Sequence, residues 1–337
     1  MDEKLILLGH GSGGGLSHDL IEGLFVRHFG NPLLLPLEDA SAFDLPPGKT
    51  AFTTDSYVVK PIFFPGGDIG RLAVCGTVND LSMRGARPLY LSAGFIIEEG
   101  FPRADLERIV VSMSDAAREA GVSIVCGDTK VVERRAADGL FINTAGVGFI
   151  PVGISVSVQN ARPGDAVIVS GTIGDHGVTV LSQRQGLHFK SPVKSDVAPL
   201  NGLAQAMLDA APAAVHVMRD PTRGGIATTL KEIASNSSVG IEIEEERLPV
   251  SEAVGAACEM LGLDYLYLAN EGKLVAIVAE DRAGQVLDAM KAHPYGPDAA
   301  VIGRVTADRP GMVTIRNPFG AKRIVEMLAG DQFPRIC

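Results

Sequence analysis

The side chain best suited to nucleophilic chemistry stands at the very end of the chain. Cys337 is the last residue, and it follows Gly330 and Pro334. Because chain ends are rarely tied down, an untethered cysteine without a function is one interpretation. The other is that an accessible thiol, with a pKa near ~8.5, is acylated and carried to another site. The rest of the sequence has to decide between them.

Four aspartates have the chemistry of a Mg²⁺ site. Asp55 interrupts a segment of β-branched and aromatic residues, and Asp80 falls on the apolar stripe of an expected helix. A carboxylate on a packing face needs a partner, either a backbone hydrogen bond or a cation. In the second case the cation is a Mg²⁺ that also holds nucleotide phosphates. Its expected ligands are Asp39, Asp55, Asp80 and Asp128.

Two residues near Asp80 are further candidates for contacting a nucleotide. Asp68 immediately precedes the same helix, so capping of the first backbone N–H groups is the simpler role for it. Asn79 shares the apolar stripe with Asp80. For each of the two residues, a structural role and a contact with the nucleotide both stay open.

Glycine-rich turns favour phosphate binding. Residues 9–15 lie between an apolar segment and an expected helix, an order typical of phosphate loops. Neither GxGxxG with its distant acidic partner nor GxxxxGK[ST] is present, so a flexible arm is equally consistent with the stretch. Gly11 and Gly13 are its candidate nucleotide contacts.

A second cluster follows the apolar run 122–126 and contains Gly127, Asp128 and Lys130. Ligand sites of α/β proteins lie at such strand ends. Lys130 beside Asp128 is either a surface ion pair or the cation that steadies a transferring phosphoryl group. Glu271, beside a glycine between two apolar segments, suits a turn as well as a catalytic base.

The elements that would position these residues alternate between apolar strands and amphipathic helices, which predicts an α/β chain of two domains. We expect strands at 50–59, 88–98, 122–130, 140–150, 166–171, 274–279, 299–305 and 312–315, and helices at 17–28, 69–84, 106–120, 200–211 and 319–328. The expected division is a Gly-rich arm and helix (1–40), an ATP-binding N-terminal domain (41–152), a C-terminal domain (153–329) and a mobile tail that carries the reactive cysteine (330–337).

Composition narrows the classes of partner. The net charge of −10 and a pI near 5.2 argue against nucleic acid and against an anionic membrane, both of which need a basic face. The four cysteines form no CxxC pair, which fits a reducing cytoplasm better than a disulfide framework. No apolar run approaches the ~18 residues of a membrane helix, and no signal-peptide pattern opens the chain.

Several of these stretches together resemble the HypE family of hydrogenase maturation factors over the full chain. The end of the chain is the most specific of them, since a tail has no packing reason to finish in this way. The matching stretches are Gly9 to Gly15, Thr53 to Val59, Phe64 to Gly70, Val78 to Leu81, Cys126 to Val132 and Pro334 to Cys337.

The resemblance implies the two-domain fold of aminoimidazole ribonucleotide synthetase, a homodimer, and ATP with Mg²⁺. It implies that the carbamoyltransferase HypF loads Cys337 with a carbamoyl group and that ATP then drives dehydration of this S-carboxamide to a thiocyanate. The cyanide would pass to iron on the HypC–HypD scaffold for a [NiFe]-hydrogenase. Lys130 would offset phosphate charge and Glu271 would be the base. The expected nucleotide contacts are Gly11, Gly13, Asp55, Asp68, Asn79, Asp80, Gly127 and Asp128.

Two other functions remain as alternatives. A small-molecule kinase or synthetase of the selenophosphate or thiamine-phosphate type would share the aspartates and glycines but would have no use for the terminal thiol. A non-catalytic carbamoyl carrier would keep the thiol and show no ATP-dependent chemistry.

Overall fold

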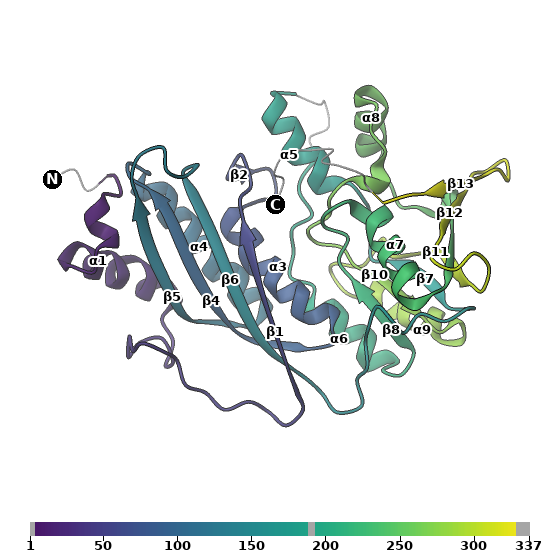
Figure 1. Cartoon of the computed structure of the whole chain (residues 1–337), viewed down its shortest axis with the longest axis horizontal. Coiled ribbons are helices and arrows are strands. Elements are labelled where there is room, and N and C mark those ends of the chain that lie inside the picture. Colours follow the sequence, from purple (N-terminus) through teal and green to yellow (C-terminus); the bar gives the residue numbers. More distant parts are fainter. Residues whose placement is uncertain (1–3, 188–192, 328–337) are drawn as a thin grey trace.

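The computed structural model describes residues 4–187 and 193–327 of the chain, which form two α/β units (Figure 1). The expected tail, 330–337, lies outside the described residues, and Cys337 with it. Among the described helices, none combines the length and the apolar character needed to cross a membrane.

The N-terminal unit is built on one sheet with the strand order β1-β6-β4-β5, called here the N-terminal sheet. Its strands are β1 (Lys49–Tyr57), β4 (Arg87–Glu98), β5 (Ser123–Val132) and β6 (Leu140–Ile150). β4 and β5 run parallel, and the other neighbours run antiparallel. This order places β1 and β5 at opposite edges of the sheet. Candidate residues on these two strands are therefore far apart within one chain.

Two helices, α3 (Ile69–Met83) and α4 (Arg103–Ala120), cover one face of this sheet. Asp68 begins α3 as an N-cap, because its Oδ1 accepts hydrogen bonds from the backbone N–H groups of Gly70 and Arg71 over 2.7 and 3.0 Å. Gly121 ends α4 with a φ of +69°, a conformation that favours glycine. Both helices therefore match their prediction closely.

A helical segment packs beside β5. It consists of η1 (Leu8–Gly11), α1 (Gly15–Leu20), the π-helical η2 (Ile21–Val26) and α2 (Arg27–Phe29). The apolar residues before η1 form only an isolated bridge between Leu5 and Pro102 rather than a strand. A short hairpin of β2 (Phe63–Phe64) and β3 (Gly67–Asp68) leads into α3.

The C-terminal unit is built on a sheet with the order β13-β12-β9-β11-β7-β10-β8. Its strands are β7 (Ala166–Val169), β8 (Val215–Arg219), β9 (Gly240–Glu244), β10 (Val275–Val278), β11 (Ala300–Thr306), β12 (Val313–Arg316) and β13 (Lys322–Val325). Its helices are α5 (Asp175–Gln185), α6 (Asn201–Ala210), α7 (Gly225–Ser237), α8 (Glu252–Leu261) and α9 (Glu280–Lys291), with the 3₁₀ turns η3 (Glu245–Arg247) and η4 (Tyr265–Tyr267). Separate apolar clusters lie on its two faces.

The predicted helix at 319–328 is wrong. Residues 322–325 form β13, which pairs antiparallel with β12. Asn317 makes the turn between them, since its Oδ1 accepts from the backbone N–H groups of Phe319 and Ala321 over 3.1 and 2.8 Å. Gly320, with a φ of +83°, completes the turn. The chain therefore reaches residue 327 on a strand hairpin.

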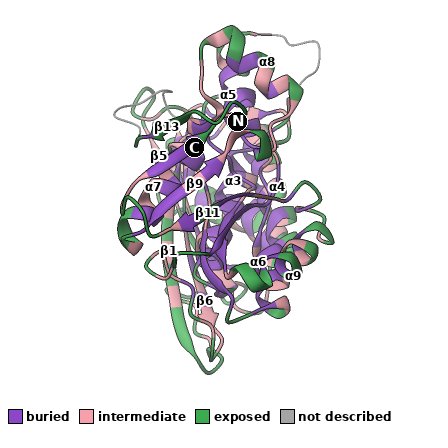
Figure 2. Ribbon diagram, turned by 90° about the vertical axis from the view of Figure 1, so that its right-hand side faces the viewer, coloured by how far each residue is buried: buried purple, intermediate pink, exposed green. Residues whose placement is uncertain are grey.

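One face of the N-terminal sheet carries no described helix. Along β1, side chains alternate between α3 and this open face, and β1 stays largely exposed or half-buried while the inner strands and helix faces are buried (Figure 2). Phe52 on β1 is 69% exposed and Ile96 on β4 is 45% exposed. Both apolar side chains therefore lie uncovered on this face of the chain.

Candidate active site

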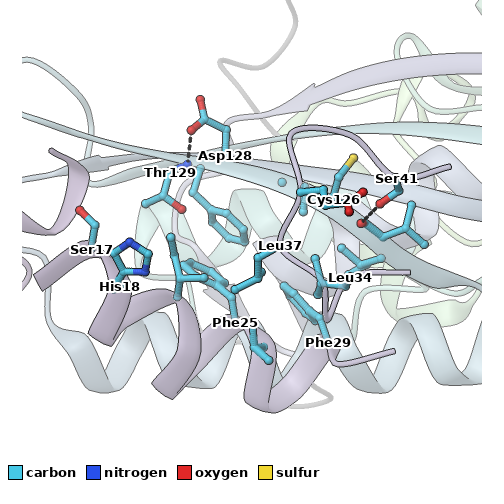
Figure 3. Close-up of a pocket in the computed structure, with 18 of the residues that line it drawn as sticks. Ser17, His18, Phe25, Phe29, Leu34, Leu37, Ser41, Cys126, Asp128 and Thr129 are labelled. Atoms are coloured by element: carbon cyan, nitrogen blue, oxygen red, sulfur yellow. Dashed lines mark hydrogen bonds between the residues drawn. The ribbon is translucent and has the colours of Figure 1, made fainter. Parts of the chain in front are cut away.

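A cavity of about 360 Å³ lies between the N-terminal helical segment, the loop that follows it, and β5 (Figure 3). We call it the β5 pocket. The loop is tied across it by two hydrogen bonds to β5, one from the Asn31 amide to the Ile124 carbonyl over 2.9 Å and one from the Ser41 hydroxyl to the Val125 carbonyl. The pocket has the volume of a small-ligand site.

One wall of the β5 pocket is apolar and the opposite rim is polar. Phe25, Phe29, Leu34 and Leu37 gather on one side, whereas Asp128 stands at the rim and points away from them (Figure 3). Phe25 is itself held by Phe95 of β4, with ring centroids 4.9 Å apart. Such an arrangement can take a flat apolar group at one end and charged groups at the other.

The predicted glycines line this pocket, and the structure explains why they are glycines. A Cβ on Gly11 would lie 2.4 Å from the backbone N of Val131, and a Cβ on Gly127 would lie 2.4 Å from the carbonyl oxygen of Ala93. Gly13 has a φ of +79°. η1 can therefore approach β5 closely.

Charged candidates stand at the rim of the β5 pocket. The Lys130 ammonium donates to Asp128 Oδ1 over 2.8 Å, and both side chains are exposed. This hydrogen bond holds the pKa of Asp128 below its ordinary value. Asp39 lines the pocket from the loop. The cluster lies within β5, which continues to Val132, rather than after the end of a strand.

A second group of acidic residues lies between the two units and is called here the acid cluster. It consists of the predicted Asp55, Asp80 and Glu271 together with Asp220. Asp80 accepts from the Thr53 hydroxyl over 2.9 Å. Burial, and then the charge of Asp55, raise the pKa of Asp80. Burial and the charge of Asp80 raise the pKa of Asp220 to about 6. Carboxylates that approach one another in this way hold protons more tightly than isolated ones.

Glu271 is the most buried member of the acid cluster. Its side chain belongs to a residue only 3% exposed, and Oε1 has no hydrogen-bond partner among the described residues. Burial raises its pKa well above the ordinary value, followed by the charges of Asp196, Asp220 and Asp55. Such a carboxylate is suited to accept a proton. Lys130 lies in the other region, so the two predicted catalytic side chains of this part of the chain do not share one pocket.

The four predicted Mg²⁺ ligands do not come together within one chain. Asp55 stands on β1 and Asp128 on β5, at opposite edges of the N-terminal sheet. In residues 4–187 and 193–327, no three His, Cys, Asp or Glu side chains group closely enough to hold a metal ion. They divide between the two regions instead: Asp39 and Asp128 line the β5 pocket, and Asp55 and Asp80 belong to the acid cluster.

Two predicted nucleotide contacts have structural tasks. Asp68 caps α3, as described above. Asn79, 2% exposed, uses its amide to join the two units: Nδ2 donates to the carbonyls of Ala198 and Glu271 over 3.1 and 3.4 Å, and Oδ1 accepts from the Leu200 N–H over 2.7 Å. It thereby holds the backbone of Glu271, one member of the acid cluster, against α3.

The two units of the chain match two known protein domains. Residues 37–150 match the N-terminal domain, and residues 162–316 the C-terminal domain, of AIR synthase related proteins. Carbamoyl dehydratase HypE of Azotobacter vinelandii is 56% identical over 97% of this chain and 96% of its own. The chain belongs to the HypE family.

Solved structures of HypE proteins are similar to this chain over nearly its whole length. The crystal structure of hydrogenase maturation protein HypE in complex with ATP has a TM-score of 0.94 and 55% identity, over 98% of this chain and 99% of that one. The HypE–HypF complex matches with a TM-score of 0.82 and 55% identity, over 92% and 99%. The predicted HypE resemblance, the two-domain aminoimidazole ribonucleotide synthetase-like fold and an enzyme of hydrogenase maturation are thereby confirmed, and the small-molecule kinase alternative is not favoured.

Sequence reasoning missed two acidic residues of this HypE family member. Asp220 directly follows the apolar strand β8, so the rule that singled out Asp128 would have found it. Asp196 has no such signal, since it is recognised only by its contacts with residues 75 and 77 positions away.

Proposed function

We propose that the chain converts the S-carboxamide of its own Cys337 into a thiocyanate at the expense of ATP, and so supplies cyanide for the iron of a [NiFe]-hydrogenase. Relatives named carbamoyl dehydratase that match nearly the whole chain support this function. The observation that carries it is Glu271, a buried carboxylate with a raised pKa and an unpartnered oxygen. A group in that state is suited to take protons from a neutral amide.

The proposed reaction balances in two steps. The carboxamide oxygen attacks the γ-phosphorus of ATP, the bond from that phosphorus to the β–γ bridging oxygen breaks, and one amide proton is removed. The C–O bond then breaks, the oxygen departs within phosphate, and the second N–H proton leaves to give S–C≡N. The products are thiocyanate, ADP, phosphate and one proton. Phosphorylation is needed because the oxygen of a carboxamide is otherwise a poor leaving group.

The β5 pocket is the proposed ATP site. Its apolar wall, formed around Phe25 and Leu37, suits a purine ring, and its glycines allow backbone N–H groups to approach phosphates. Lys130 stands at the rim, where its ammonium can exchange Asp128 for a phosphate oxygen. A HypE protein 55% identical to this chain is known in complex with ATP, which supports the assignment.

Each region offers two of the predicted aspartates as ligands for Mg²⁺. Mg²⁺ in proteins takes one or two carboxylates together with substrate phosphates, and each of the two carboxylate pairs meets that requirement. The residues that would hold the ion are Asp39 and Asp128 in the β5 pocket, and Asp55 and Asp80 in the acid cluster. When bound, Mg²⁺ supplies neutralisation of the charge on the phosphoryl group being transferred.

The thiols in the described part of the chain are poor candidates for the carbamoyl group. Burial raises the pKa of Cys75 to about 12 and that of Cys258 to about 11. Partial burial also raises the pKa of Cys126, which lines the β5 pocket. Thiols that hold their protons react slowly. This supports Cys337 as the loaded residue and makes Cys126 its natural control.

We infer that the enzyme is a homodimer joined through the open face of the N-terminal sheet. Exposed Phe52 and Ile96 would be covered there. If two such sheets stack about a two-fold axis parallel to their strands, the β5 edge of one chain lies over the β1 edge of the other. The β5 pocket and the acid cluster, which are apart in one chain, would then meet across the dimer and bring Lys130 toward the other chain's Glu271.

The proposed partners follow from the reaction. A HypF carbamoyltransferase would load Cys337, and a HypC–HypD scaffold would receive the cyanide, in the cytoplasm. A HypE protein similar to this chain forms a HypE–HypF complex, which supports the first of these contacts. The acidic net charge gives no reason to expect nucleic acid or an anionic membrane surface.

The test is the intact mass of the C-terminal peptide after loading by the carbamoyltransferase and addition of Mg²⁺ and ATP. We expect a carboxamide adduct on Cys337 that loses one water only when ATP is present, and the same result in a Cys126→Ala variant. An adduct that persists with ATP would leave only a carrier. The absence of any adduct would contradict the assignment of Cys337.

A further inference from the structure

Glu271 stands on a tight turn, residues 270–273, that one buried carboxylate holds from two sides. Asp196 Oδ1 accepts from the Glu271 backbone N–H over 3.1 Å, and Oδ2 accepts from the Lys273 ammonium over 3.3 Å. The side chains of Asp196 and Lys273 are only 3% and 13% exposed. The same carboxylate therefore grips the residues on either side of Gly272.

The backbone around Asp196 is fixed as well. Gly272 allows it to approach, since a Cβ there would lie 1.7 Å from the Asp196 carbonyl oxygen. The neighbouring Ser195 donates its backbone N–H to the Pro65 carbonyl over 2.8 Å, and its hydroxyl lies 2.8 Å from His176 Nδ1. Asp196 thus stands on a segment anchored to both units, which is what holding another residue in place requires.

We propose that Asp196 is a positioning residue for Glu271: by binding the Glu271 N–H and the Lys273 ammonium together, it fixes the turn that presents the Glu271 carboxylate. This inference rests on the proposed function, in which Glu271 removes the amide protons. A displacement of about 1 Å at a reacting group can cost on the order of a hundredfold in rate, so such a turn has to be held.

The charges that face Glu271 predict the direction in which its pKa shifts when Asp196 is changed. Burial contributes most to its raised pKa; the charges of Asp196, Asp220 and Asp55 raise it further, in that order, and Arg223 lowers it. Lys273 faces Asp196 and lowers the raised pKa of its other neighbour, Asp175. Removing the charge of Asp196 while keeping its shape should therefore make Glu271 give up its proton at a lower pH.

The first experiment is the pH dependence of single-turnover dehydration in loaded, full-length Asp196→Asn. The amide oxygen can still accept from the Glu271 N–H, so the fold is kept. We expect the rise of the dehydration rate with pH to move to lower pH by about one unit. The maximal rate should also fall, because the base that remains next to Lys273 is weaker. The KM for ATP should stay unchanged. Lys273→Gln, which keeps a donor but removes the positive charge, should move this rise toward higher pH.

The matched control is Asp165→Asn. Asp165 is also a buried carboxylate of the C-terminal unit that accepts a backbone N–H, from Arg162, and pairs with a basic side chain, His216, over 2.8 Å. It does not appear among the charges that act on Glu271. Its substitution should leave the rise of the rate with pH where it is.

Glu271→Gln separates this inference from the proposed function. If Glu271 is the base, Glu271→Gln loses turnover, and adding Asp196→Asn to it changes nothing further, because residues that act as a unit are not additive. An Asp196→Asn profile with an unshifted rise, in a protein where Glu271→Gln is inactive, overturns the positioning role and leaves the base. A Glu271→Gln variant that still dehydrates at the wild-type rate overturns the base itself.

Discussion

The β5 pocket and the acid cluster use the same residue types in opposite surroundings. Asp128 and Lys130 are 67% and 62% exposed and paired, and the pKa of Asp128 is lowered. Glu271 is 3% exposed, has an oxygen without a described partner, and has a raised pKa. Water and a counter-ion stabilise a carboxylate anion, whereas burial among other anions favours its protonated form. The β5 pocket therefore favours ionised side chains, and the acid cluster favours protonated ones.

The largest loss of dehydration rate is expected from a substitution in the acid cluster. Glu271→Gln keeps the shape of the side chain but removes its ability to accept a proton. We expect single-turnover dehydration to fall by about a thousandfold while ATP still binds, because general-base catalysis contributes roughly 10²–10⁴-fold. Rate and ATP affinity are measured on the same loaded protein. Glu242→Gln, which changes a mostly buried glutamate paired with Lys322, should keep its rate.

The next largest effect is expected from a substitution in the β5 pocket, which should weaken ATP binding. Lys130→Ala removes an ammonium expected to meet phosphate, so ATP affinity should fall by roughly thirtyfold, on the order of 2 kcal/mol. Calorimetric titration with Mg²⁺ and ATP measures it. Lys60→Ala is the control, because Lys60 is as exposed as Lys130 and pairs with Asp138 over 2.9 Å. Equal losses in both variants would mean that Lys130 acts only through general charge.

A smaller effect concerns stability and pH. The folded state holds the Asp220 proton up to about pH 6, so between about pH 4 and pH 6 the unfolded state binds fewer protons and folding stability falls as pH rises. Asp220→Asn removes this loss. We expect a gain of about 1–2 kcal/mol at pH 7.5, allowing for the partial exposure of the residue, and little gain near pH 4. Denaturant titrations at the two pH values decide it: an equal gain at both would point to packing instead of charge.

The smallest effect separates a helix cap from a ligand. Asp68→Ala should cost about 1 kcal/mol of stability by leaving the N–H groups at the start of α3 unpaired, and Asp68→Asn should recover most of it. Thermal unfolding measures both variants. Neither should weaken ATP binding, and a loss of affinity in the well-capped Asn variant would place Asp68 in the nucleotide site after all.

Local features of the fold and site were predictable, whereas long-range ones were not. The start of α3 at Asp68 and the end of α4 at Gly121 follow from capping rules that involve adjacent residues only. Gly127, Asp128 and Lys130 are neighbours in sequence, so their joint presence in the β5 pocket needed only the position of β5. These predictions depend on contacts within a few residues.

The burial of Glu271 depends on contacts that no local pattern contains. Asp196, Asn79 and Asp55 reach it from distant parts of the chain, so the sequence alone left a turn and a base equally open. The first strand of the hairpin at 313–325 was predicted, but its second strand, 322–325, was taken for part of a helix for a different reason. Its apolar spacing also fits a helix, and only the turn made by Asn317 and Gly320 decides for strands.

Mixed dimers show whether the β5 pocket and the acid cluster serve one reaction across a dimer. Lys130→Ala and Glu271→Gln are each expected to impair dehydration when both chains carry the change. A heterodimer with one variant in each chain contains one site with both residues intact if the site spans the two chains. When such heterodimers are loaded on Cys337, we expect about half as many chains to be dehydrated as in the wild-type dimer, measured by intact mass. Dehydration that stays at the level of the two parent variants would contradict this expectation.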